Sequence, residues 1–246
     1  MDVIVLLLAG SATALATGFG AVPVFMLGQR SHRLRPALWG FAAGTMAVAS
    51  VVGLLLPAAG DGSFSEVVPG VVAGVAFMLA ARRFVDTHDV TIGAMDARRA
   101  RASVLVFFVL LVHSVPEGLA IGTAYASETA GLGLYVILAI ALQNVPEGTS
   151  TAIPMQAAGF GRAQQFWAAV LTSAPQPVAA VGAFLAVEQV ESLLPVSFGF
   201  AAGAMLALVA LELVPQALAG RRWRGPALGA AGGAALMLLL AALLGV

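Results

Sequence analysis

Long apolar runs separated by short polar connections make up almost the whole chain. A run of about 20 mainly apolar residues is long enough to cross the hydrocarbon core of a bilayer as a helix. The pattern predicts eight such helices, at approximately 3–27, 36–58, 67–85, 103–125, 131–153, 166–187, 195–217 and 226–245. We therefore expect an all-α membrane protein with a single transmembrane domain over residues 1–246 and a longer loop at 86–100.

The composition agrees with this class. Hydrophobic residues make up 60% of the chain and charged residues only 10%, which is not the composition of a soluble domain. The absence of cysteine excludes thiolate metal sites and disulfides. We expect the lipid bilayer as a partner and no nucleic acid.

The basic residues predict the orientation in the membrane. All of them are arginines, and they fall only in alternate connections, after the first, third, fifth and seventh predicted helices. Cytoplasmic loops of membrane proteins carry the excess of positive charge. The pattern therefore places these connections, including the loop at 86–100, in the cytoplasm and both termini on the extracytoplasmic side.

A short sequence occurs in both halves of the chain. G-F-A-A-G at 40–44 is followed by Met46, and the same five residues at 199–203 are followed by Met205. The second and seventh helices that carry them run in opposite directions. This indicates an inverted repeat of helices 1–3 and 6–8 around a central pair, helices 4 and 5, an arrangement typical of secondary transporters. The alternative is ordinary packing of small residues between helices.

A second repeated pattern places glutamates inside the central pair. H-S-V-P-E-G at 113–118 and Q-N-V-P-E-G at 143–148 lie deep within apolar runs. A charged side chain at the centre of a bilayer costs about 2.5 to 3.5 kcal/mol, so each glutamate needs a partner inside the protein. Pro116 and Pro146 lack an N–H group and are expected to bend their helices at the same depth.

The spacing brings polar side chains together. His113 and Glu117 share one helix face, as do Gln143 and Glu147, because residues four apart are neighbours on a helix. An imidazole and two carboxylates suit zinc, with iron, manganese or cadmium as alternatives. Hydrogen-bonded glutamates acting as proton relays in a metal-independent solute or proton carrier are the competing interpretation. A membrane metallohydrolase is disfavoured because the chain has no H-E-x-x-H segment, so we expect no enzyme.

With these motifs the chain resembles the ZIP (Zrt-, Irt-like) divalent metal transporters, in particular the bacterial GufA-like branch. The resemblance implies a metal site between the fourth and fifth helices, with the metal as transported substrate and no prosthetic group. It implies uptake toward the cytoplasm by alternating access, and a homodimer. Carried over by position, the ligands of the first metal would be His113, Glu117, Gln143 and Glu147, with Met46 close by.

The chain departs from the family where a second metal would bind. Ser114, Asn144 and Gln176 stand at those positions, and neutral oxygens replace a carboxylate. We therefore predict a weakened or absent second site, which leaves a nonconducting, metal-sensing relative as an alternative.

Other polar residues indicate an exit pathway. Glu212 matches a glutamate of the family's seventh helix, and Asp86, His88 and Asp89 form either a weak metal-capturing loop or a solvated turn. The preference for arginine, alanine and glycine hints at a bacterial cytoplasmic (inner) membrane.

Overall fold

The computed structural model describes residues 2–87, 97–220 and 223–246, and these residues form helices and short connections without any strand. The first half of the chain contains α1 (Asp2–Phe19), α2 (Val22–Leu27), the 3₁₀ turn η1 (Gly28–Arg33), α3 (Arg35–Ser50), the π-helical turn η2 (Val51–Leu55), α4 (Leu56–Asp61), α5 (Phe64–Thr87) and α6 (Ala97–Ala126). The second half contains α7 (Leu132–Ala157), α8 (Arg162–Thr172), α9 (Pro175–Gln189), α10 (Leu193–Leu208), the π-helical turn η3 (Val209–Leu213), α11 (Val214–Leu218) and α12 (Arg224–Leu244).

Seven helical segments in the described ranges are long and apolar enough to span a membrane. The predicted span at 131–153 is the one that does not qualify. It corresponds to α7, which has 26 residues and is therefore about 39 Å long, but carries a run of polar side chains in its second half. The loop predicted at 86–100 is shorter in the structure, since α5 continues to Thr87 and α6 begins at Ala97. Hydropathy alone does not show where a helix extends beyond its apolar part.

Two helices change their winding just before a proline. The π-helical turn η2 lies between α3 and α4 and precedes Pro57, and η3 lies between α10 and α11 and precedes Pro215. A proline cannot donate the backbone hydrogen bond of a regular helix, and a wider π turn is one way to accommodate it. Such turns are frequent at functional sites.

Glycines form two close helix contacts of the same construction. A methyl group at Gly40 or Gly44 of α3 would overlap the backbone carbonyls of α12, and one at Gly229 or Gly233 would overlap those of α3. The contact between α5 and α10 repeats this design with Gly70, Gly74, Gly199 and Gly203. Small residues spaced four apart let two helices approach closely inside a membrane. The repeated G-F-A-A-G sequences therefore form packing surfaces, each against a different helix.

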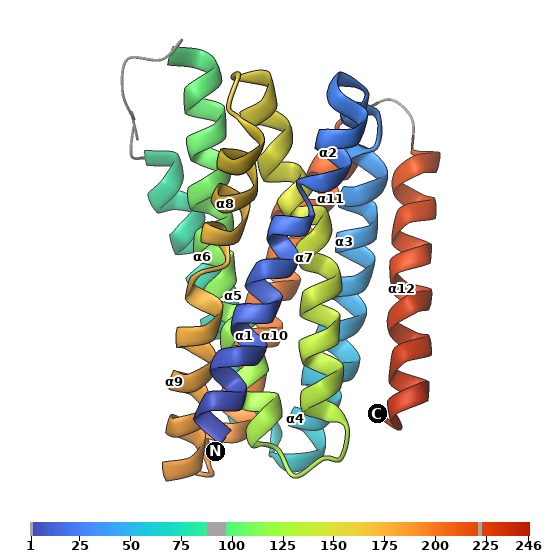
Figure 1. Cartoon of the computed structure of the whole chain (residues 1–246). Helices are drawn as coiled ribbons and strands as arrows, with labels where there is room; N and C mark the ends of the chain where they lie inside the picture. The colour runs from blue at the N-terminus through green and yellow to red at the C-terminus, as the bar shows by residue number, and fades with distance from the viewer. Residues whose placement is uncertain (1, 88–96, 221–222) are drawn as a thin grey trace.

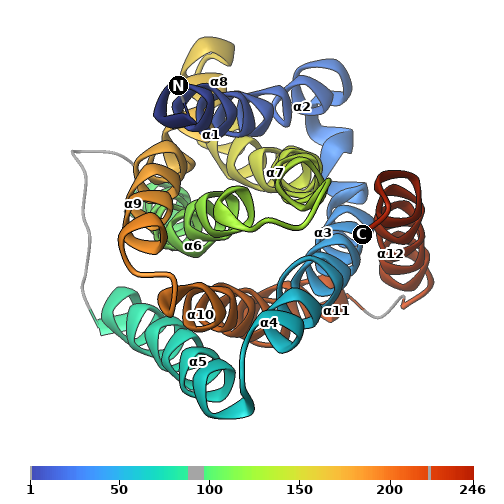
Figure 2. The ribbon, with the colours of Figure 1, turned by 90° about the horizontal axis from the view of Figure 1, so that it is seen from below.

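The helices α6 and α7 occupy the middle of the bundle (Figure 2). They pack against each other; α6 also contacts α9 and α10, and α7 also contacts α1 and α3. Because other helices surround them, polar side chains on α6 and α7 can be enclosed by protein. This placement lets intramembrane polar groups avoid lipid.

The two ends of the bundle differ in charge. Both chain termini lie at the lower end in Figure 1, together with the turn that leads from α4 to α5. The helix ends that carry arginines, including the starts of α3, α8 and α12, lie at the upper end. The described arginines are therefore gathered at the end opposite the termini.

Candidate intramembrane metal site

The four predicted ligands on the central helices are buried. Each of these side chains is at most 5% exposed, and both helices continue through their prolines without a break. The four are His113 and Glu117 on α6, and Gln143 and Glu147 on α7. Met46 on α3 is also fully buried.

Glu117 is held by two amides. Its Oε1 accepts a hydrogen bond of 2.8 Å from Gln143 Nε2, and its Oε2 accepts one of 2.7 Å from Gln176 Nε2. Glu147 stands one turn after Gln143 on the same face of α7, which brings its carboxylate to the side of α7 that faces Glu117. Two neighbouring carboxylates cannot both be charged without strong repulsion unless a cation lies between them or near them.

Three of the predicted ligands present atoms that nothing in the described structure satisfies. His113 Nδ1, Gln143 Oε1 and Glu147 Oε1 are buried and have no hydrogen-bond partner among the described residues. A buried polar atom without a partner costs about 1 to 3 kcal/mol. Unpaired nitrogen and oxygen atoms on facing helices are therefore available to a bound cation.

A cavity of about 170 Å³ opens beside this cluster. His113 and Glu147 lie in its wall together with Trp39 of α3, and it extends to Arg82 of α5 and Glu212 of η3. The cavity thus connects the buried ligands to the end of the bundle that carries the arginines.

The site is not closed around an ion in this conformation. In the described ranges, no three His, Asp or Glu side chains converge closely enough to hold a metal on their own. Both oxygens of Glu117 are bonded to amides instead. The structure bonds Glu117 to Gln143, and places His113 on the same cavity as Glu147.

Two of the residues predicted for a weak second site form a neutral network with α1. Gln176 Oε1 accepts hydrogen bonds from Thr13 Oγ1 at 2.7 Å and from Asn144 Nδ2 at 3.1 Å. Asn144 Nδ2 also donates to the Thr13 carbonyl at 2.7 Å. Ser114, the third predicted residue, instead donates to the Thr172 carbonyl at 2.8 Å. The network contains no carboxylate other than the adjoining Glu117.

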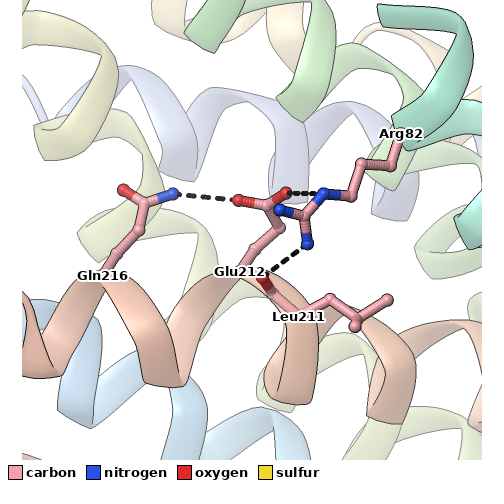
Figure 3. A network of polar contacts seen from close by, with 4 residues as sticks. All are labelled: Arg82, Leu211, Glu212 and Gln216. Carbon is pink, nitrogen blue, oxygen red and sulfur yellow. Dashed lines mark hydrogen bonds and ion pairs between the residues drawn. The ribbon is translucent and has the colours of Figure 1, made fainter. Parts of the chain in front are cut away.

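The predicted exit residues fall into two groups. Glu212 lies in the π turn η3, lines the cavity and forms an ion pair with Arg82 (Figure 3). The side chain of Asp86 and all of His88 and Asp89 lie outside the described residues, so their expected role stays a prediction.

Sequence reasoning missed three residues that shape the site. Thr13 is one of them, although Thr13 and Thr17 stand four apart in a largely apolar helix and therefore share one face. Nothing in the sequence indicates that Trp39 lines the cavity, because aromatic residues are common near helix ends. Arg82 is one of the arginines that indicate the orientation in the membrane, and its sequence position does not reveal that it faces the cavity.

The fold and the site define the class: an integral membrane protein with a polar, partly unsatisfied cluster enclosed between its central helices. The family model described as "ZIP Zinc transporter" matches residues 86–241. The chain therefore belongs to the ZIP family, and the resemblance seen in the motifs is confirmed.

The descriptions of three similar proteins agree with this family assignment. The zinc transporter GufA of Myxococcus xanthus is 30% identical, over 95% of this chain and 95% of its own. The zinc transporter ZIPB of Bordetella bronchiseptica is 32% identical, over 97% of this chain and 81% of its own. An Arabidopsis thaliana relative is 35% identical over 84% of this chain, which spans only 33% of that longer protein. The relatives support metal-ion transport rather than enzymatic activity.

Proposed function

We propose that the chain is a secondary transporter that moves divalent transition-metal ions, zinc foremost, across the membrane toward the cytoplasm by alternating access. The observation that carries the proposal is the set of buried, unpartnered atoms His113 Nδ1, Gln143 Oε1 and Glu147 Oε1 beside a cavity. Imidazole combined with carboxylate is a ligand set for zinc, iron, manganese or cadmium rather than for magnesium or calcium. The printed names of the relatives favour zinc among these metals.

The neutral network supports a single bound metal. Gln176 and Asn144 bond to Thr13 and to each other, and Gln176 also bonds to Glu117. Their polar atoms are therefore already satisfied without an ion. Glu117 and Glu147 supply two negative charges, which balance one divalent cation.

The charge distribution supports orientation and direction of transport. An acidic cavity of about 790 Å³ lies at the end of the bundle that holds the termini. It is lined by the carboxylates of Asp2, Asp61, Glu66, Glu128, Glu188 and Glu191. A cleft lined by negative charge concentrates cations. The arginine-bearing end faces the cytoplasm under the positive-inside rule, so both termini lie outside and cations are collected there.

An eight-span inverted repeat fits the packing of the helices. If α7 is the fifth span, α3 and α12 are the second and eighth spans, and α5 and α10 are the third and seventh. The predicted repeat relates the second span to the seventh and the third to the eighth, so it relates the α3–α12 contact to the α5–α10 contact. Each of these contacts is built on two pairs of glycines. The cavity beside His113 and Glu147 extends toward the cytoplasmic end, so the conformation is inward-facing. Alternating access then requires the helix groups around α6 and α7 to move against each other.

Replacing one carboxylate tests the proposal. In proteoliposomes, Glu147→Gln is expected to reduce zinc flux to background, because it removes one of the two charges that balance the ion. Glu191→Gln removes the same charge from the acidic cavity, where five other carboxylates remain, and is the matched comparison that is expected to keep flux well above background. Folding of both variants is checked by size-exclusion chromatography and thermal unfolding. Normal zinc flux in Glu147→Gln would contradict the site assignment.

A further inference from the structure

An ion pair joins two helices beside the central cavity. Arg82 Nε of α5 lies 3.5 Å from Glu212 Oε1 in η3 (Figure 3). The Arg82 side chain is 44% exposed and that of Glu212 only 20%. The guanidinium therefore reaches from the surface toward a carboxylate that lies deeper in the bundle.

The backbone next to Glu212 provides a second hydrogen-bond acceptor for Arg82. Arg82 Nη1 also donates a hydrogen bond of 2.9 Å to the carbonyl of Leu211. Pro215 follows four residues later and has no N–H group to bond that carbonyl in an α-helical register. The proline thus makes a carbonyl acceptor available next to Glu212, and the guanidinium contacts both this carbonyl and the carboxylate.

Gln216 holds the other side of the carboxylate. Its Nε2 donates to Glu212 Oε2 at 3.2 Å, while its Oε1 accepts a hydrogen bond of 3.4 Å from Arg35 Nη2 of α3. Both oxygens of Glu212 are therefore engaged, one by a cation and one by a neutral amide. The amide orients the carboxylate without neutralising it.

The same pair lines the route from the metal site. Arg82 and Glu212 contribute to the cavity that contains His113 and Glu147, and also to a smaller adjoining cavity that reaches His113. An ion that leaves the central cluster through this cavity meets a carboxylate already paired with a guanidinium. A divalent cation and Arg82 compete for the same oxygen atoms.

On the basis of the proposed transport function, we propose that Arg82 and Glu212 form the exit gate of this transporter. Glu212 is a transient station for the departing cation, and Arg82 is a tethered cation that occupies the station when it is empty and displaces the metal toward the cytoplasm. A partly exposed ion pair shifts an equilibrium by only about fivefold, so it can break and re-form in each cycle.

If the ion pair only stabilised the contact between α5 and η3, the variants would behave differently. Loss of either partner would then lower stability, and removing both would not restore transport. A gate predicts compensation, because the carboxylate traps metal only when its tethered cation is missing. The double variant separates the two roles.

The first experiment measures zinc flux in proteoliposomes and equilibrium zinc binding to the purified protein. Arg82→Gln is expected to bind an additional, weaker zinc ion and to transport about threefold to fivefold more slowly, the range expected for one ion pair. Adding Glu212→Gln is expected to remove the additional ion and to restore most of the flux. Arg33→Gln, which removes an exposed arginine at the same end of the bundle, is the matched control and is expected to behave as wild type.

The second experiment does not depend on transport. The chain has no cysteine, so Val109→Cys introduces a single thiol in the wall of the cavity. A positively charged thiol reagent is expected to modify it about fivefold faster when Arg82→Gln is also present, because the tethered cation is gone. Unchanged modification, no additional zinc in Arg82→Gln, or no recovery of flux when Glu212→Gln is added would overturn the gate. Absence of zinc binding and flux in the wild type would contradict the transport function itself, while the thiol measurement would still test the gate.

Discussion

Gln176 donates its side-chain amide to Glu117 at a distance of 2.7 Å, and both side chains are fully buried. The same glutamine accepts hydrogen bonds from Thr13 and Asn144. It therefore connects α9 to α1, α6 and α7 through one side chain. This contact fixes the direction of the Glu117 carboxylate from the side opposite Gln143.

A carboxylate in place of this amide is expected to change the number of metals bound. Gln176→Glu would set a second acidic group against Glu117, and the two would repel unless a cation came between them. We expect equilibrium zinc binding to rise from one ion per chain to two. Gln189→Glu, at the exposed end of the same helix, adds the same charge and is expected to leave the binding ratio at one. A wild-type ratio of two with similar affinities would show that the neutral network does bind metal.

Removal of the imidazole is expected to weaken binding at the central site. His113→Ala deletes the buried nitrogen donor that has no partner in the described structure. Loss of a group that only supports a metal ligand typically costs 10- to 100-fold in affinity, so loss of a ligand should cost at least about tenfold. Isothermal titration with zinc measures the effect.

The matched control is His32→Ala, which removes an exposed histidine outside the site. It is expected to keep the affinity of the unmodified protein. If His113→Ala kept its zinc affinity but lost proton-dependent solute flux, the metal-independent carrier would be the better explanation.

The motifs predicted which polar residues would be buried on the central helices, but not how they are held. Burial of His113, Glu117, Gln143 and Glu147 followed from their spacing in apolar runs, because such side chains must avoid lipid. Hydrophobicity also placed the outer ends of the helical segments to within a few residues, except at the connection between α5 and α6, but it did not indicate the interruptions between α1 and α2 and between α8 and α9. At the connection between α5 and α6, helix continues into polar sequence at Thr87 and Ala97, and no local pattern marks that extension.

Contacts between distant segments were beyond the sequence. The repeat at 40–44 indicated a packing surface, but nothing in it identified Gly229 and Gly233 of α12 as its partner. In the same way, Arg82 looks like any arginine near a helix end. Its contact with Glu212 depends on how α5 packs against α10, a relationship that a single sequence does not encode locally.

The glycine contacts give a prediction about stability. Gly44→Ala places a methyl group where the backbone carbonyl of Ala230 already lies, so α3 and α12 must move apart. Overpacking of this kind typically costs about 1 to 3 kcal/mol. We expect a lower thermal unfolding temperature in detergent. Gly232→Ala on α12 is the matched control, because a methyl group there meets no neighbouring atom and alanine favours the helix. An equal loss in both variants would mean that the close contact does not stabilise the bundle.

The eight-span arrangement can be tested with single cysteines, because the chain contains none. Thr129 lies in the connection between α6 and α7, and His32 lies in η1, and both are exposed. If α7 spans the membrane and the arginine-bearing end is cytoplasmic, the two positions face opposite sides. An impermeant maleimide is expected to label Thr129→Cys in intact cells, and to label His32→Cys only after the membrane is opened. Labelling of both variants in intact cells would contradict the arrangement, and the reverse pattern would invert the orientation and with it the proposed direction of transport.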